Sequence, residues 1–147
     1  MNKKSAFKFA EGCLYRYLEN KARIEALREE LRELGGGHVK VQSYDERTGT
    51  NNYIDNVPPR IVKIDDIERQ IVRIERRVLP IERLIKDLES PMNLSRERRE
   101  MLCILQMRYF NQNTWDRTIE HMGISIHTFV KRRRQLVAIT VRYLGVK

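Results

Sequence analysis

A regular series of aliphatic residues between residues 61 and 88 constrains the fold more than any other part of the sequence. The residues recur in steps of three and four: Ile64, Ile67, Ile71, Ile74, Val78, Ile81, Ile85 and Leu88. A helix with this spacing presents one narrow apolar seam, as in a coiled coil. Pro80 lies inside the series and removes one backbone hydrogen bond. The apolar phase continues across Pro80, so the pattern predicts one kinked helix rather than two separate helices.

A second seam predicts another long helix over residues 6 to 34. Its members are Ala10, Cys13, Tyr17, Ile24, Leu27, Leu31 and Leu34, and the glycines at 35 to 37 end it. Asn20 occupies the same seam. It either sets the register of the packing, as polar seam residues do in coiled coils, or is tolerated near a solvated edge.

Each seam is too narrow to form a complete core, so each needs a partner. The simplest arrangement is an antiparallel, coiled-coil-like hairpin of the two helices, and a dimer of hairpins would bury more apolar surface. The loop at about 35–60 is long for a compact domain. Val39, Val41, Tyr53 and Ile54 could pair as a small ribbon, but a partly disordered loop is favoured.

The C-terminal part of the chain has the pattern of a helix-turn-helix. After a break at Ser90-Pro91, residues 94 to 110 read as a helix. Thr114 can cap a short second helix, Gly123 can end it, and Ser125 can cap a third helix running from about 126 to 144. We therefore expect an all-α protein. Residues 1–90 would form a hairpin for oligomerisation or partner binding, and residues 91–147 a three-helix DNA-binding module.

The positive charge is concentrated in this second module. Residues 95–147 hold 11 Lys and Arg against 4 Asp and Glu, whereas residues 1–94 hold 18 against 16. A localised excess of this kind is the electrostatic footprint expected for a polyanion. The residues expected to contact DNA, at the start of the last helix, are Ser125, Ile126, His127, Thr128, Lys131, Arg132, Arg134 and Gln135. The candidates to reach base edges are Ile126, His127, Thr128, Lys131 and Arg132, and of these His127 and Thr128 could hydrogen-bond to bases or to phosphate. Arg132, Arg134 and Gln135 lie where the helix would grip the phosphate backbone.

Two features have a structural as well as a functional interpretation. A run of cations such as Lys131 to Arg134 is usually a solvated helix face, but its place after a capped helix start favours DNA contact. Four consecutive residues go around a whole helical turn, so they cannot all face DNA. Arg133 is expected to lie near the buried stripe. Trp115 could stack on a base, but its position favours a core role.

The sequence gives no sign of catalysis or of a bound cofactor. It has neither a catalytic pair of carboxylates nor a phosphate-cradling glycine loop, so we expect no enzyme activity and no small-molecule substrate. Cys13 and Cys103 resemble small buried hydrophobic residues rather than a disulfide or metal site, and the three histidines lack ligand spacing. No membrane-spanning run or signal peptide is recognised, which favours a cytoplasmic protein.

The C-terminal pattern resembles the ArpU and RinA-like phage transcriptional regulators. The similar residues are Met107 to Phe110, Thr114-Trp115, Gly123-Ile124-Ser125, Thr128, Arg132 to Arg134 and Tyr143-Leu144-Gly145. The resemblance implies a helix-turn-helix similar to region 4 of sigma factors and a role in switching on phage late genes in the bacterial host. Family members commonly have Ile and Ala where this chain has Thr118 and Ile119, which predicts a wider or shifted helix crossing.

The leading hypothesis is a sequence-specific, dimeric regulator that binds double-stranded DNA and acts with host RNA polymerase. Two alternatives remain at this point. One is a DNA-packaging protein similar to small terminase subunits, although their DNA-binding module usually comes first. The other is a helical adaptor whose basic end binds an acidic partner.

Overall fold

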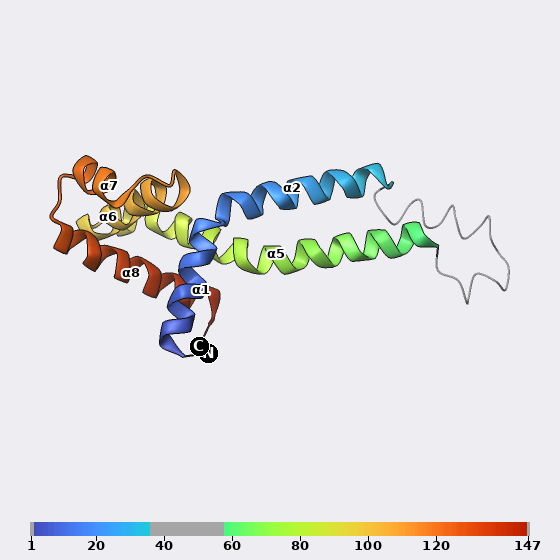
Figure 1. The fold of residues 1–147 in the computed structure, drawn as a ribbon, viewed down its shortest axis with the longest axis horizontal. Coiled ribbons are helices and arrows are strands. Elements are labelled where there is room, and N and C mark those ends of the chain that lie inside the picture. Colours follow the sequence, from blue (N-terminus) through green and yellow to red (C-terminus); the bar gives the residue numbers. More distant parts are fainter. Residues whose placement is uncertain (1, 36–57, 147) are drawn as a thin grey trace. The chain divides into compact units, whose positions relative to one another are not determined.

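The computed structural model describes residues 2–35 and 58–146, and every regular element among them is helical (Figure 1). The helices are α1 (Lys3–Tyr15), α2 (Tyr17–Glu33), α5 (Pro59–Glu89), the 3-10 turn η1 (Pro91–Asn93), α6 (Arg96–Ile104), the π-helix η2 (Leu105–Phe110), α7 (Trp115–Met122) and α8 (Ile126–Leu144). The predicted all-α class is confirmed.

The chain forms two compact units, each assembled from segments that are distant in sequence. The larger unit comprises Met1–Glu19 and Arg76–Lys147, and the smaller unit comprises Asn20–Glu75. This division differs from the expected domains 1–90 and 91–147. The reason is that α1 packs against α8 and η2, and the end of α5 also belongs to the larger unit.

The first long helix of the prediction is in fact two helices. A single helix over residues 6 to 34 is wrong, because the chain leaves helical geometry at Arg16, where φ is −97° and ψ is 5°. Before this point α1 buries Ala6, Ala10, Cys13 and Leu14 in the larger unit. After it, Ile24 and Leu27 of α2 are buried in the smaller unit. Tyr17, at the start of α2, is also buried in the larger unit, so the division between the units comes after Glu19 and not at the break.

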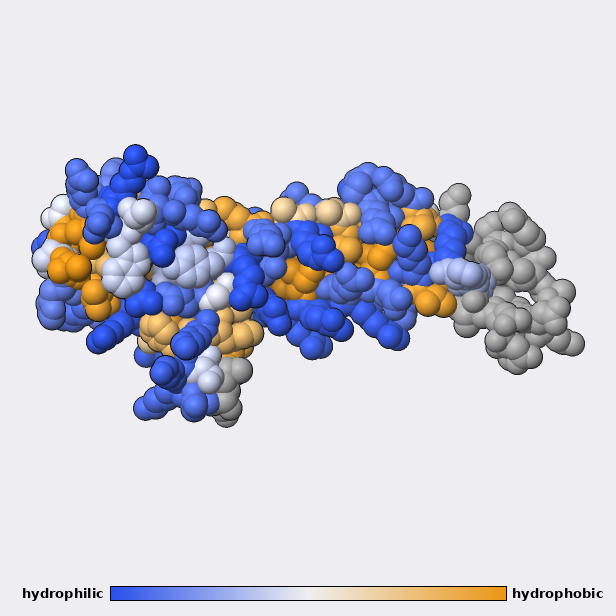
Figure 2. Space-filling view, viewed as in Figure 1, coloured by the Kyte–Doolittle hydropathy of each residue, from blue (hydrophilic) through white to orange (hydrophobic). Residues whose placement is uncertain are grey.

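The smaller unit pairs the rest of α2 with the first part of α5. Arg28 Nη2 lies 2.9 Å from Glu75 Oε2, Lys63 Nζ lies 3.7 Å from Glu30 Oε1, and Arg60 Nε donates to the Leu34 carbonyl at 2.8 Å. These partners run in opposite sequence order, so the two segments are antiparallel. Figure 2 shows small hydrophobic patches along this unit between hydrophilic side chains.

The aliphatic seam of α5 is largely buried. Six of its eight members are shielded from solvent: Ile64, Ile67, Ile71, Val78, Ile81 and Leu88. Ile74 and Ile85 are half-buried. The helix is continuous from Pro59 to Glu89 with Pro80 inside it, so the prediction of one helix across Pro80 is confirmed.

The larger unit has a fully enclosed core built from six elements. Its most buried side chains are Leu14 of α1, Ile81, Leu84 and Leu88 of α5, Ile104 of α6, Leu105 and Tyr109 of η2, Thr118 of α7, and Phe129, Leu136, Val137 and Thr140 of α8. The predicted helix over residues 94 to 110 begins later, because Ser95 caps α6. Leu94, the first residue of the predicted helix, lies before the cap and is 48% exposed.

The π-helix η2 was not predicted. The Asn111 N–H donates to the Gln106 carbonyl at 2.9 Å, the i to i−5 spacing of a π turn. This segment buries Tyr109 completely and stacks the Phe110 ring on Tyr17, with centroids 5.0 Å apart. The widened turn therefore supplies the aromatic contacts between η2 and the N-terminal part of the chain.

The last helix has the predicted limits. Its apolar periodicity predicts a buried stripe of Phe129, Leu136, Val137, Thr140 and Leu144, and only Leu144 of these is half-buried rather than buried. Phe129, Leu136, Val137 and Thr140 have no exposed surface, and Gly145 ends the helix with φ of 68°. The predictions for the loop, including the ribbon of Val39, Val41, Tyr53 and Ile54 and the expected disorder, concern residues outside those described.

Replacing one seam residue should destabilise the smaller unit. Ile67 is 3% exposed, so Ile67→Ala should lower the free energy of unfolding by about 2–5 kcal/mol through lost burial and a cavity. Val72 is on the same helix but 49% exposed. Val72→Ala should therefore change the free energy of unfolding by less than about 0.5 kcal/mol. Urea unfolding followed by circular dichroism would measure both. Equal values for the two variants would contradict the packing described.

Candidate nucleic-acid interface

A capped turn joins α7 to α8. Thr114 Oγ1 accepts a hydrogen bond from the Arg117 N–H at 3.2 Å and caps the start of α7. Gly123 ends α7 in the left-handed region, with φ of 65° and ψ of 33°. Ser125 Oγ then accepts from the Thr128 N–H at 3.1 Å and caps α8. All three predicted helix-end roles are confirmed, and they fix the direction in which α8 leaves the turn.

The structure exposes five of the eight predicted contact residues. Ser125, Ile126, His127, Lys131 and Arg134 are exposed, and Ile126 is the most prominent apolar side chain among them at 62%. The Thr128 side chain is only half-buried, and its Oγ1 accepts a hydrogen bond from Ser125 Oγ at 3.0 Å. The first turn of α8 thus presents polar and apolar groups to solvent.

One face of α8 is exposed along its whole length. His127, Lys131, Arg134, Ala138 and Arg142 recur at intervals of three and four residues and all are exposed, so they form one line along the helix. We call this line the exposed stripe. The sequence of α8 contains no Asp or Glu, so no carboxylate of the helix itself offsets these cations.

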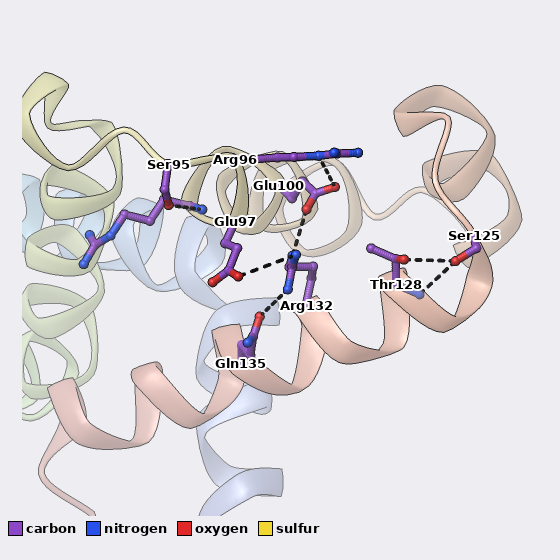
Figure 3. A network of polar contacts seen from close by, with 9 residues as sticks. Ser95, Arg96, Glu97, Glu100, Ser125, Thr128, Arg132 and Gln135 are labelled. Atoms are coloured by element: carbon purple, nitrogen blue, oxygen red, sulfur yellow. Dashed lines mark hydrogen bonds and ion pairs between the residues drawn. The ribbon is translucent and has the colours of Figure 1, made fainter.

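Arg132 belongs to the interior network rather than to the exposed stripe (Figure 3). Its Nε donates to Glu100 Oε1 of α6 at 2.8 Å, and its Nη2 lies 3.9 Å from Glu97 Oε1. The Arg132 and Glu100 side chains are only 12% and 11% exposed. Gln135 is also half-buried and accepts from Arg132 Nη1 at 3.0 Å.

These contacts revise the expected phosphate contacts of Arg132 and Gln135. Both side chains already have partners within the larger unit, because α6 places its carboxylates beside this part of α8. The prediction rested on their position in the basic run. That position does not reveal which side of the helix a neighbouring element covers.

Arg133 holds α8 against the N-terminal helix. Its Nε and Nη2 donate to the two carboxylate oxygens of Glu11 in α1, each at 2.9 Å. The side chains of Arg133 and Glu11 are 19% and 16% exposed. The guanidinium also lies over the rings of Phe7 and Trp115, at 5.5 Å and 5.2 Å from their centroids. The expected location of Arg133 near the buried side of α8 is confirmed.

Tyr109 completes this cluster from η2. Its hydroxyl donates to Glu11 Oε2 at 2.6 Å. Burial and then the hydrogen bond to Glu11 raise the pKa of Tyr109 well above its usual range, so the hydroxyl stays protonated and continues to donate. Three elements (α1, η2 and α8) therefore meet at one carboxylate.

The remaining aromatic and small residues of α7 support the turn. The Trp115 ring is half-buried and tilts against Phe129 at 5.2 Å between centroids, in line with the packing role favoured from the sequence. Thr118 has no exposed surface, and its hydroxyl donates to the Thr114 carbonyl at 2.9 Å. The polar residue at this position is therefore satisfied within its own helix.

The sequence prediction missed the part played by α1. A usable signal was present, since Glu11 shares a helical face with Phe7 and Leu14. A carboxylate on an otherwise apolar face indicates a buried cationic partner. The identity of that partner could not be read from the sequence, because Arg133 lies 122 residues away.

Candidate metal ligands, thiols and membrane spans were considered for residues 2–35 and 58–146. No group of His, Cys, Asp and Glu in residues 2–35 and 58–146 could hold a metal ion. Cys13 is buried, Cys103 is half-buried, and both are free. Burial raises the pKa of each thiol. None of the described helices has the length and apolar character needed to cross a membrane.

A protein-family model matches a large part of the chain. Residues 37–140 match DUF1492, described as a protein family of unknown function and commonly seen in phage proteins. The chain belongs to the DUF1492 family. The DUF1492 match covers α5, α6, η2, α7 and most of α8, whereas α1 and its Glu11 lie before it. No curated protein and no solved structure matches the chain.

Breaking the pair between α1 and α8 should destabilise the larger unit. Glu11→Ala leaves Arg133 without its carboxylate in a mostly buried position, which should cost about 3–5 kcal/mol of unfolding free energy. Glu25→Ala, at an exposed position of α2, is the matched control and should have little effect. Denaturant unfolding would compare them.

The double variant Glu11→Leu with Arg133→Met gives the complementary test. Made together with Tyr109→Phe, so that no buried hydroxyl loses its Glu11 acceptor, this replacement of both charges by apolar side chains should recover much of the lost stability. A Glu11→Ala variant as stable as the Glu25→Ala control would show that the pair does not hold α1 to α8.

Proposed function

We propose that this DUF1492 protein is a sequence-specific DNA-binding transcriptional regulator and that the first turns of α8 enter the major groove. The observation that carries the proposal is the exposed stripe of α8, which holds three cations and a histidine on a helix without a carboxylate. A recognition helix needs a capped start that reaches the bases and cations beyond it that meet phosphates.

The division of the basic run supports this role. Arg132 and Arg133 are paired with carboxylates of other helices, so they stabilise the fold. Lys131 and Arg134 are exposed, and no ion pair is found for either within residues 2–35 and 58–146. Lys131 and Arg134 are therefore available to bind an external anion. Arg132 and Arg133 hold the orientation of α8 through their ion pairs.

Three side chains at the start of α8 are suited to base contacts. Ile126 can contact a thymine methyl group, and His127 and Thr128 can hydrogen-bond to base edges. Lys131 and Arg134 follow one and two turns after His127 on the same face, where they would meet phosphates. The start of α8 is therefore proposed to contact the bases. The positions that follow it are proposed to contact the phosphate backbone of the DNA.

The biological setting rests on the resemblance of residues 107–145 to the ArpU and RinA-like phage regulators. It favours activation of phage late genes together with host RNA polymerase in the bacterial cytoplasm. A homodimer would present two α8 helices to half-sites about 34–36 Å apart. Selection of bound fragments from the parent phage genome, followed by footprinting, would test the proposal and define the site.

Substitutions in α8 should separate base reading from phosphate binding. His127→Ala or Thr128→Ala should lose about 1–3 kcal/mol on the selected duplex and little on a scrambled one, because base contacts carry sequence preference. Arg134→Ala should weaken both duplexes alike and reduce the log–log salt slope by about 1, because one phosphate contact is lost. Titrations at several salt concentrations would measure these effects. Arg23→Ala, an exposed cation of the smaller unit, is the control.

The same titrations distinguish the alternatives. If every α8 variant changed the selected and scrambled duplexes by one common factor, α8 would not read sequence. A ring of many subunits would then indicate a packaging protein. Absence of any salt-dependent DNA binding would favour a helical adaptor for an acidic protein.

A further inference from the structure

A second group of cations lies at the other end of α8, away from the residues that the sequence singled out. A cleft of about 440 Å³ is lined by Arg83, Lys86 and Asp87 of α5 and by Arg142 and Tyr143 of α8. All five residues belong to the larger unit. The proposed reading of bases does not use this cleft, so its chemistry calls for a separate explanation.

The charge of the cleft fits an anion. Its three cations are exposed, and none of them forms an ion pair within the described part of the chain. The one carboxylate, Asp87, already accepts a hydrogen bond from the Tyr143 hydroxyl. Two guanidinium groups and an ammonium suit phosphate oxygens, because arginine can donate two parallel hydrogen bonds and lysine adds a compact charge.

The position of the cleft favours duplex DNA as the source of that phosphate. Arg142 is both a lining residue and the last member of the exposed stripe. Fifteen residues separate it from His127, which corresponds to about 22 Å along a helix. This is shorter than one turn of B-DNA at about 34 Å, so one duplex can span both ends of the stripe.

We propose that the cleft formed by Arg83, Lys86 and Arg142 binds a backbone phosphate of the duplex beside the segment read by the start of α8. This inference rests on the proposed function. It adds α5 to the DNA-binding surface and makes part of the affinity independent of sequence. Asp87 limits that affinity, because its charge lies beside the bound phosphate.

The first experiment removes the two cations that α5 contributes. Arg83→Ala with Lys86→Ala should weaken selected and scrambled duplexes by the same factor and reduce the log–log salt slope by about 1. The matched control is Arg23→Ala with Arg73→Ala, which removes two exposed cations from the smaller unit. An equal decrease in the control would overturn the proposal, since it would reflect total charge rather than a site.

The second experiment should increase binding. Asp87→Asn removes the negative charge but keeps an oxygen that can accept from the Tyr143 hydroxyl. Both duplexes should bind about twofold to fivefold more tightly at low salt, the range expected for a single surface charge interaction. Most of the gain should disappear when Asp87→Asn is combined with Arg83→Ala and Lys86→Ala, because only Arg142 of the three lining cations would then remain to hold a phosphate. Unchanged binding in Asp87→Asn would count against the cleft.

Failure of this inference can be told apart from failure of the proposed function. If Arg134→Ala reduces the salt slope but the Arg83→Ala and Lys86→Ala variant does not, DNA binding stands and the cleft is not part of it. If the unaltered chain binds no duplex at any salt concentration, the proposed function fails and the cleft proposal fails with it.

Discussion

Neutralisation of two arginines in α8 is the interaction on which the larger unit depends. The helix has no carboxylate of its own, so the charges of Arg132 and Arg133 must be met by other elements. Glu100 of α6 pairs with Arg132, and Glu11 of α1 pairs with Arg133. Charge-assisted hydrogen bonds of this kind are directional. The two pairs therefore fix the rotation of α8 about its axis and decide which residues form its exposed stripe.

Features with a local physical cause could be predicted from the sequence. The caps at Thr114 and Ser125 and the left-handed Gly123 require only nearby backbone groups, and all three occur in the structure. The seam of α5 could be predicted because apolar periodicity determines which face of a helix is buried. The buried stripe of α8 followed from the same reasoning. These elements provide the frame of the candidate interface.

Features that depend on distant partners could not be predicted in the same way. The sequence alone does not distinguish the four cations Lys131 to Arg134 from one another. Arg132 is paired only because α6 places Glu100 beside it in the folded chain. The break at Arg16 is marked in sequence only by Gly12, one turn earlier, which is too weak a signal to end a helix by itself. The π-helix η2 likewise depends on aromatic contacts with Tyr15 and Tyr17. Contacts of this kind come from other elements of the chain, which the local sequence does not reveal.

In α8 the residues that stabilise the fold are different from those proposed to read DNA, and this affects which substitutions the protein can tolerate. Structural contacts are made by Arg132 and Arg133, whereas Ile126, His127 and Lys131 project into solvent. Exposed positions tolerate substitution with little effect on stability. Under the proposed function, the preferred DNA sequence could therefore drift between related phages without a compensating change in the core. The same separation makes the start of α8 a suitable place to engineer a new binding preference on an unchanged scaffold.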